Sequence, residues 1–199
     1  TADNNTGVGY NSLVANTTGA GNTAVGKGAL DANTTAGNNV AVGQDSLGSN
    51  TTGGQNTALG LSAMAGNTTA TDNVAVGYIA LLTNTTGGSN VAVGTAAMRM
   101  NTTGASNVGV GGIALNANTT ASNNTAVGYG ALQVNTSGGN NTAVGKGALD
   151  ANTTAASNTA VGAACLTTNT TGTQNVAMGV SALEANTTGD NNVSIGNNS

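Results

Sequence analysis

Side chains that could perform acid–base or nucleophilic chemistry are scarce in this sequence. Its 199 residues include three Lys or Arg, seven Asp or Glu, one Cys and no His. Two carboxylates that act together on a substrate must lie within about 5–10 Å of one another. The carboxylates here are scattered along the chain, and Asp31 and Asp150 come from distant segments. We therefore predict no catalytic residues and no enzymatic activity.

Metal and cofactor ligands are equally sparse. Calcium-binding β-rolls carry Asp in every structural unit, because the carboxylates are the ligands. No Asp recurs at a fixed interval here, so we predict no metal site and no cofactor. The lone Cys165 has no basic residue near it in the sequence, which indicates a small buried side chain and not a reactive thiol.

One motif with recognised chemistry recurs throughout the chain. Asn-Thr-Thr, or once Asn135-Thr-Ser137, matches the acceptor motif for N-glycosylation. An alternative role for these Asn residues is structural, as turn or ladder residues selected by stacking. The candidate glycosylation residues are Asn16, Asn33, Asn50, Asn67, Asn84, Asn101, Asn118, Asn135, Asn152, Asn169 and Asn186.

This motif recurs because the whole chain is built on a repeat of 17 residues. With Asn5 as position 1, Asn occupies that position in twelve successive copies without insertion or deletion. Eleven full repeats cover residues 5–191, and partial repeats cover 1–4 and 192–199. A fixed short period is typical of solenoid proteins. We therefore predict a single array over residues 1–199.

Two repeat positions are apolar in every copy and are predicted to form the core. Position 4 is Val in nine copies, and position 9 is always Leu or Met. The predicted core residues are Val25, Leu30, Val42, Leu47, Val76, Leu81, Val127, Leu132, Val144, Leu149, Val161 and Leu166.

Two other positions indicate turns and ladders. Position 5 is always Gly, which implies a positive φ or the close approach of another backbone segment. Position 12 is always Asn, and stacked Asn side chains can form amide ladders. The predicted turn and ladder residues are Gly26, Gly43, Gly77, Gly128, Gly145, Asn33, Asn50, Asn84, Asn118 and Asn152.

The elements that position these residues are short strands. Positions 2–4, as in residues 23–25, alternate β-branched and small side chains before Gly ends the segment. A helical repeat is disfavoured because 17 is a poor multiple of 3.6, and the strict spacing argues against disorder. Coils stacked about 4.8 Å apart would pair every strand with its neighbours. The predicted fold is all-β, a parallel β-solenoid (β-roll) of 17-residue coils.

Positions 6 and 10 vary widely, which predicts that they face solvent or a partner. Position 6 includes Tyr, Lys, Gln, Leu and Gly, and position 10 includes Asp, Gly, Arg and Glu. Exposed aromatic side chains are favoured anchors in protein interfaces. The candidate surface recognition residues are Tyr10, Tyr78 and Tyr129, although tolerance at an exposed site explains them equally well.

The charge and hydropathy patterns exclude two kinds of partner. The formal net charge is −4 and no basic patch exists, so we expect no binding to nucleic acid. No apolar run is long enough for a membrane helix, so we expect no membrane insertion by this segment. The chain starts at Thr1 without a signal peptide, and we expect it to be a mature or excised segment of a longer protein.

Several of the strand motifs resemble a known family. Asn192-Val-Ser-Ile-Gly196 and Asn39-Val-Ala-Val-Gly43 are similar to the N-S-V-A-I-G head repeats of trimeric autotransporter adhesins, and comparable repeats occur in phage tail fibres. The resemblance implies a left-handed parallel β-roll, assembly into a homotrimer and binding to surfaces or matrix proteins. The 17-residue coil is longer than the usual unit of those heads, and the family's neck, stalk and membrane anchor are absent from this sequence.

We therefore expect a non-enzymatic, extracellular structural or adhesive protein that forms a stiff rod, head or filament on a cell or virion surface. Its expected partners are further copies of itself, in a homotrimer or an end-to-end filament, and host or matrix macromolecules or glycans. Two alternatives remain open. Regular Thr files could bind ice, although adjacent positions 13 and 14 would leave only one file exposed. A glycosylated surface-filament subunit is the other.

Overall fold

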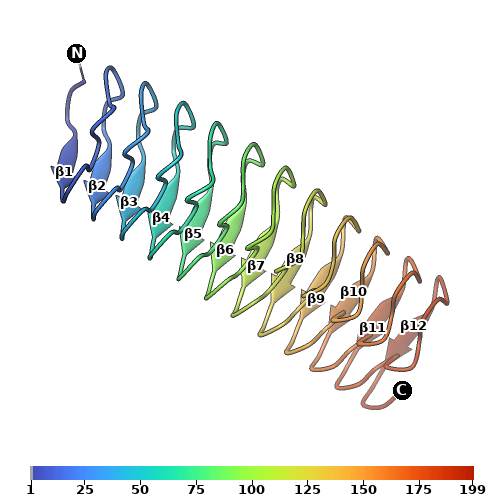
Figure 1. Cartoon of the computed structure of the whole chain (residues 1–199). Coiled ribbons are helices and arrows are strands. Elements are labelled where there is room, and N and C mark those ends of the chain that lie inside the picture. The colour runs from blue at the N-terminus through green and yellow to red at the C-terminus, as the bar shows by residue number, and fades with distance from the viewer. Residues whose placement is uncertain (1) are drawn as a thin grey trace.

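Each repeat contributes one three-residue strand at positions 2–4, and the strands stack in chain order. The computed structural model describes residues 2–199. These residues form one parallel sheet of twelve strands whose order follows the sequence (Figure 1). The strands are β1 (Thr6–Val8), β2 (Thr23–Val25), β3 (Val40–Val42), β4 (Thr57–Leu59), β5 (Val74–Val76), β6 (Val91–Val93), β7 (Val108–Val110), β8 (Thr125–Val127), β9 (Thr142–Val144), β10 (Thr159–Val161), β11 (Val176–Met178) and β12 (Val193–Ile195).

Residues that pair in neighbouring strands occupy the same position of the 17-residue repeat. Ala24 in β2 pairs with Ala41 in β3, and each later pair is also 17 residues apart. The result is a parallel β-solenoid with one 17-residue coil per repeat, drawn out as a rod with its strands along one side (Figure 1). Strand-to-strand contacts link consecutive coils only. Within residues 2–199, no helix is long and apolar enough to cross a membrane.

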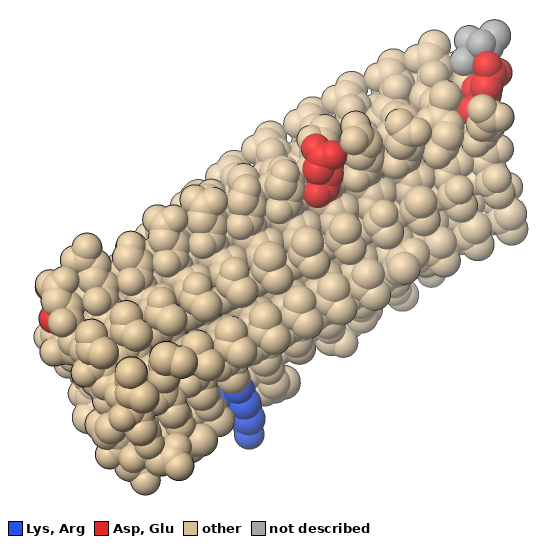
Figure 2. Space-filling view, turned by 180° about the vertical axis from the view of Figure 1, so that it is seen from behind, with Lys and Arg blue, Asp and Glu red and all other residues tan. Residues whose placement is uncertain are grey.

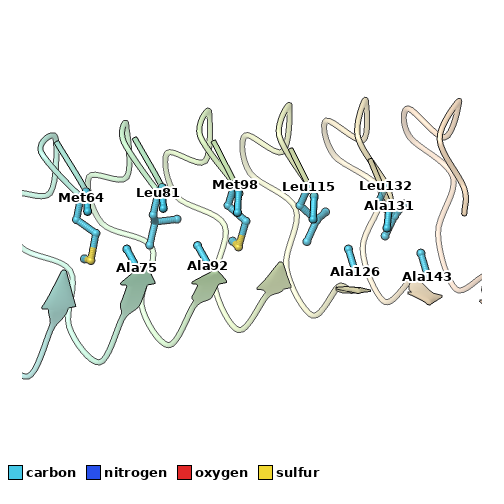
Figure 3. Packing of buried hydrophobic residues seen from close by; sticks show 14 of the residues in the cluster. Met64, Ala75, Leu81, Ala92, Met98, Leu115, Ala126, Ala131, Leu132 and Ala143 are labelled. Atoms are coloured by element: carbon cyan, nitrogen blue, oxygen red, sulfur yellow. The ribbon is translucent and has the colours of Figure 1, made fainter. Parts of the chain in front are cut away.

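Small side chains at positions 3 and 8 and a Leu or Met at position 9 fill the interior. Ala24, Ala29 and Leu30 of one coil are fully buried, and the equivalent residues of the other interior coils repeat the arrangement. Figure 3 shows these side chains meeting between the sheet and the opposite turns, with Met64 and Met98 replacing Leu in two coils. The predicted core residues Leu30, Leu47, Leu81, Leu132, Leu149 and Leu166 all have no exposed surface.

The valines at position 4 do not belong to this core, and the prediction that they do is wrong. Val42 and Val127 are exposed, and Val25, Val76, Val144 and Val161 are only half-buried. Successive side chains of a strand point to opposite faces, so once Ala at position 3 points inward, positions 2 and 4 must point outward. Alanine leaves enough room beside the sheet for one leucine per coil, and the interior has no place for a second large side chain.

The glycine at position 5 ends each strand because the next coil lies against it. Its φ lies in the positive region in every coil, for example +134° at Gly128. A β-carbon on Gly128 would lie 2.6 Å from the carbonyl oxygen of Gly145 in the next coil. Both reasons for glycine, the backbone conformation and the close approach, therefore apply at this position.

Three other positions per coil also have positive φ, and the sequence did not predict them. They are positions 7, 9 and 17, as in Gly28, Leu30 and Asn38. Leu30 has a φ of 52°, which is uncommon for a residue of this kind. Complete burial of the side chain offsets the cost, because the burial of a leucine contributes about 2 kcal/mol.

Candidate interaction surface

A ladder of asparagine side chains runs through the rod at position 12. In a typical coil the Asn50 Nδ2 donates to the Asn33 Oδ1 at 3.0 Å and to the Gly53 carbonyl oxygen at 2.9 Å. Asn33 and Asn50 are fully buried, as are Asn84, Asn118 and Asn152 in later coils. Buried amides of this kind are stabilising only when every polar atom has a partner. No buried side-chain nitrogen or oxygen of the described residues lacks one.

A second file of asparagines, at position 1, joins the first at a shared acceptor. The Asn22 Oδ1 accepts a bond from the Asn39 backbone nitrogen at 3.0 Å, and the Asn22 Nδ2 donates to the Ala36 carbonyl at 2.9 Å. The same carbonyl accepts the Asn33 Nδ2 at 3.0 Å. Most coils are therefore closed internally by two amides on one carbonyl, whereas the Asn73 Nδ2 donates instead to the Thr71 carbonyl at 3.0 Å. Neighbouring coils are tied together by the same side chains.

This arrangement favours the structural role of these asparagines over the alternative role as glycosylation acceptors in the folded chain. The Nδ2 atom of the Asn in each motif is the atom that would carry the glycan. It donates both ladder bonds from Asn33 to Asn186, and the Asn16 Nδ2 donates to the Gly19 carbonyl alone. Nine of the candidates are fully buried, from Asn33 to Asn169. Asn16 and Asn186 in the outermost full coils are half-buried, and their Nδ2 atoms also donate hydrogen bonds. In the folded rod these side chains bond within their own coil and, from Asn33 onward, to the preceding coil.

The outward side chains of the sheet form an apolar strip, which we name the outer sheet face and define as positions 2 and 4 of β1 to β12. Position 4 is Val, Leu, Met or Ile in every strand, and position 2 is Val or Thr. Leu59 and Met178 are exposed, and the position-4 residues between them are exposed or half-buried. Regular strand alternation in the sequence could have revealed this strip, because a residue on each side of a buried Ala must face outward. A contiguous apolar strip of this length is typical of an interaction site.

The side chains at position 6 form a second exposed file on the turn that follows each strand. Tyr10, Tyr78 and Tyr129 are 71%, 53% and 60% exposed, so all three candidate recognition residues lie on the surface. The Tyr129 ring lies over Gly112 of the preceding coil, where a β-carbon would be 3.4 Å from the nearest ring carbon. The rings are thus presented along one line of the rod, and they are not brought together into a single cluster.

The threonines at positions 13 and 14 form two files along the rod, which differ in hydrogen bonding and exposure. At position 13, the Thr34 Oγ1 donates to the Thr51 carbonyl of the next coil at 3.1 Å, and most of this file does the same. At position 14, Thr35 and Thr52 are exposed. Only one file of exposed Thr hydroxyls therefore runs along the rod, and a flat two-dimensional hydroxyl array is not formed. Ice binding gains no support from this geometry.

Burial or hydrogen bonding shifts the pKa of Asp150, Cys165 and Asp190. Burial raises the pKa of the Asp150 carboxyl, and burial likewise raises the pKa of the Cys165 thiol, whose Sγ donates to the Ala177 carbonyl at 3.2 Å. Hydrogen bonds from the backbone nitrogen and the Oγ1 of Thr173, at 2.6 and 3.0 Å, lower the pKa of the exposed Asp190 carboxyl. A thiol with a raised pKa is less ionised at neutral pH and is therefore a weak nucleophile.

Residues 2–199 enclose no pocket, and they hold no group of three or more acidic, Cys or His side chains that could bind a metal ion. Figure 2 shows one long face of the rod on which charged side chains are few and widely separated. Comparison with protein-family models, with curated proteins and with solved structures gives no match. The outward files of side chains are therefore the candidate functional features of this molecule.

Proposed function

We propose that this protein is a non-enzymatic, extracellular structural and adhesive rod that assembles with copies of itself on a cell or virion surface. The observation that carries the proposal is the outer sheet face. A strip that is apolar in every coil, on a rod whose exposed files at positions 6 and 10 vary freely, is most simply explained by one constant partner. Another copy of the same chain presents the same strip in the same register.

The homotrimer implied by the adhesin-like strand motifs is the assembly that we propose. Three rods that turn their outer sheet faces toward a common axis would bury Val42, Leu59, Val127 and their neighbours from water. Burial of apolar surface contributes roughly 25 cal/mol for each Å². Because the strip extends through twelve strands, many small contributions add along the rod.

The adhesive part of the proposal rests on the files that such an assembly leaves free. Positions 6 and 10 carry charged, polar, aromatic and aliphatic side chains in different coils, so they are not constrained by the packing of the rod. A repeat scaffold with a constant interior and a variable surface is a common way to bind macromolecules along an extended face. Surface display is therefore the role that we propose for Tyr10, Tyr78 and Tyr129.

Light scattering after size-exclusion chromatography tests the assembly. We expect the wild-type protein to have three times the chain mass of 18.7 kDa. Replacing Val76 and Val110 by Lys puts two charges on the outer sheet face, which should reduce the mass to that of one chain because buried charges are costly. A wild-type protein that is a monomer at all concentrations would contradict the proposal.

A matched control separates loss of assembly from loss of folding. Thr86 and Thr120 lie at position 14 of the same two coils and are exposed. Their replacement by Lys adds the same charge on another face and should leave the trimer mass unchanged. Circular dichroism of both double variants should show the wild-type strand signal.

A further inference from the structure

One part of the variable surface differs from the rest in its chemistry. We number the coils from coil 1 (residues 5–21), and we define the central patch as the side chains at positions 6, 7 and 10 of coils 4–8 (residues 56–140). The central patch contains no Asp or Glu and one basic residue, Arg99. Coils 2 and 3 instead carry Lys27, Asp31 and Asp45 at these positions, and coil 9 carries Lys146 and Asp150. The side chains that define its character are Leu61, Tyr78, Ile79, Arg99, Ile113 and Tyr129.

Positions 6, 7 and 10 form one continuous surface. Position 10 reaches over position 7 of the preceding coil: the Asn116 Nδ2 donates to the Ala96 carbonyl at 2.8 Å, and the Thr167 Oγ1 donates to the Gly147 carbonyl at 3.0 Å. By the same repeat geometry, Arg99 stands beside position 7 of the preceding coil, which is Ile79. Position 6 directly precedes position 7, so the Tyr side chains border the same surface.

The backbone at position 7 does not favour the residues found in this patch. Ile79 and Ile113 have φ values of 50° and 53°, in the left-handed region that β-branched residues avoid. Other coils use Gly, Asn, Asp, Ser or Ala at this position. Both isoleucines are also partly exposed, so the core does not select them. Strained residues of this kind are often kept for function, and here they add apolar surface next to Arg99.

The Arg99 guanidinium is exposed and has no partner among the described residues. On the surface of positions 6, 7 and 10, the nearest carboxylate is Asp45, at position 7 two coils from Ile79, and Asp150 and Asp31 lie three and four coils from Arg99. At about 4.8 Å per coil these separations are roughly 10, 14 and 19 Å, beyond the Debye length of about 8 Å at physiological salt. The charge of Arg99 is thus available to a ligand, and guanidinium groups favour planar anions such as carboxylates.

The shape of the patch favours a ligand that lies along the rod. There is no pocket in the described chain, and Tyr78 and Tyr129 stand three coils apart in one file, about 14 Å at the strand spacing. Flat aromatic rings offer apolar surface together with a polar hydroxyl, which suits the C–H and O–H faces of sugar rings. We infer that the central patch binds a linear, carboxylate-bearing polysaccharide, with Arg99 pairing with a carboxylate and Tyr78 and Tyr129 stacking on sugar rings. This inference rests on the adhesive role proposed above and specifies its ligand class.

Affinity electrophoresis of the full chain in gels that contain polygalacturonate tests the inference. We expect the polymer to retard the wild-type protein and neutral dextran to leave its mobility unchanged. Arg99→Gln should weaken binding about tenfold, which is roughly the loss in affinity expected when one charge-assisted hydrogen bond is removed. Tyr129→Ala should weaken it by a similar factor. Added salt should weaken binding of the wild type, because a charge pair contributes to it.

The matched controls lie outside the patch. Lys146→Gln removes an exposed positive charge from position 6 of coil 9, and Thr86→Ala shortens an exposed side chain on another face of the rod. Both should bind within about twofold of the wild type. Equal losses from Arg99→Gln and Lys146→Gln would overturn the inference, because they would indicate non-specific attraction to the polymer.

Two further outcomes would also overturn it. Equal retardation by polyglutamate would assign the patch to an acidic protein partner. No retardation by polygalacturonate would show that the patch does not bind carboxylate-bearing polysaccharides. Light scattering on the same samples separates either result from a failure of the proposed function. A trimer that does not bind the polymer would leave the structural rod intact and discard only this ligand.

Discussion

At the scale of single residues, the asparagine at position 12 illustrates how a polar side chain can hold a nearly uncharged rod together. The Asn84 Nδ2 donates to the Asn67 Oδ1 at 3.1 Å and to the Gly87 carbonyl at 2.9 Å, and its Oδ1 accepts the Asn101 Nδ2 at 2.8 Å. No other side chain of the same size offers two donors and an acceptor on one planar group. The ladder therefore continues only while every coil supplies Asn.

Asn84→Ala should destabilise the rod by about 3 kcal/mol, because three hydrogen bonds are lost and buried partner atoms remain unpaired. Urea unfolding followed by circular dichroism measures this loss. Thr86→Ala, in the same coil but exposed, is the control and should change stability by no more than about 0.5 kcal/mol. Similar values for the two variants would show that the ladder contributes little.

At the scale of the element, glycine is required at position 5 of the coil by a close contact, whereas at position 7 only the backbone conformation favours it. Gly128 at position 5 has a β-carbon site 2.6 Å from the Gly145 carbonyl oxygen. Gly147 at position 7 has a φ of 64°, and no atom lies within 4 Å of its β-carbon site. Ala164 occupies position 7 of the next coil with a φ of 54°. Position 7 therefore tolerates a side chain, and position 5 does not.

Gly128→Ala should cost about 3 kcal/mol or more, because the added methyl group would force neighbouring backbones apart. Gly147→Ala should cost only about 1 kcal/mol, the price of a left-handed conformation for an alanine. Thermal unfolding of the two variants under identical conditions makes the comparison. The explanation fails if the two substitutions are equally harmful.

At the scale of the whole molecule, the rod behaves as a one-dimensional array. Each strand contacts only the strands of adjacent coils, so no strand-to-strand contact depends on the total number of coils. Stability in such arrays is approximately a sum of repeat terms and nearest-neighbour terms. The length of the rod can therefore change by whole coils without a change in the interior.

Deletion of residues 141–157 should give a folded rod that is shorter by one coil. The new neighbours match, because Ala126 would pair with Ala160 and Leu132 would lie beside Leu166. Circular dichroism per residue should be unchanged. Deletion of residues 141–149 removes part of one repeat and should disrupt the fold from that point, because later strands lose their register. Equal tolerance of both deletions would rule out a register-dependent array.

The period of the sequence determined much of this architecture. Exact spacing of Gly26, Leu30 and Asn33 and of their equivalents predicted a parallel β-solenoid of 17-residue coils, and the structure has that fold. Such information is local and repetitive: a fixed period aligns like residues in neighbouring coils whatever the path of the chain within one coil. Position 9 is Leu or Met in every copy, and its side chain is fully buried in each coil from Leu30 to Leu166.

The direction of each side chain was decided only by the tertiary structure. Val42 and Leu47 are equally apolar and equally regular in the sequence, yet Leu47 is fully buried and Val42 is 38% exposed. The difference arises because Ala41 points inward from the strand, so its neighbour Val42 points outward. Leu47 lies after the strand, in a backbone conformation with positive φ, and its side chain lies in the core. Composition and period state which residues recur, whereas the backbone path within a coil decides which of them face the interior, the sheet surface or a partner.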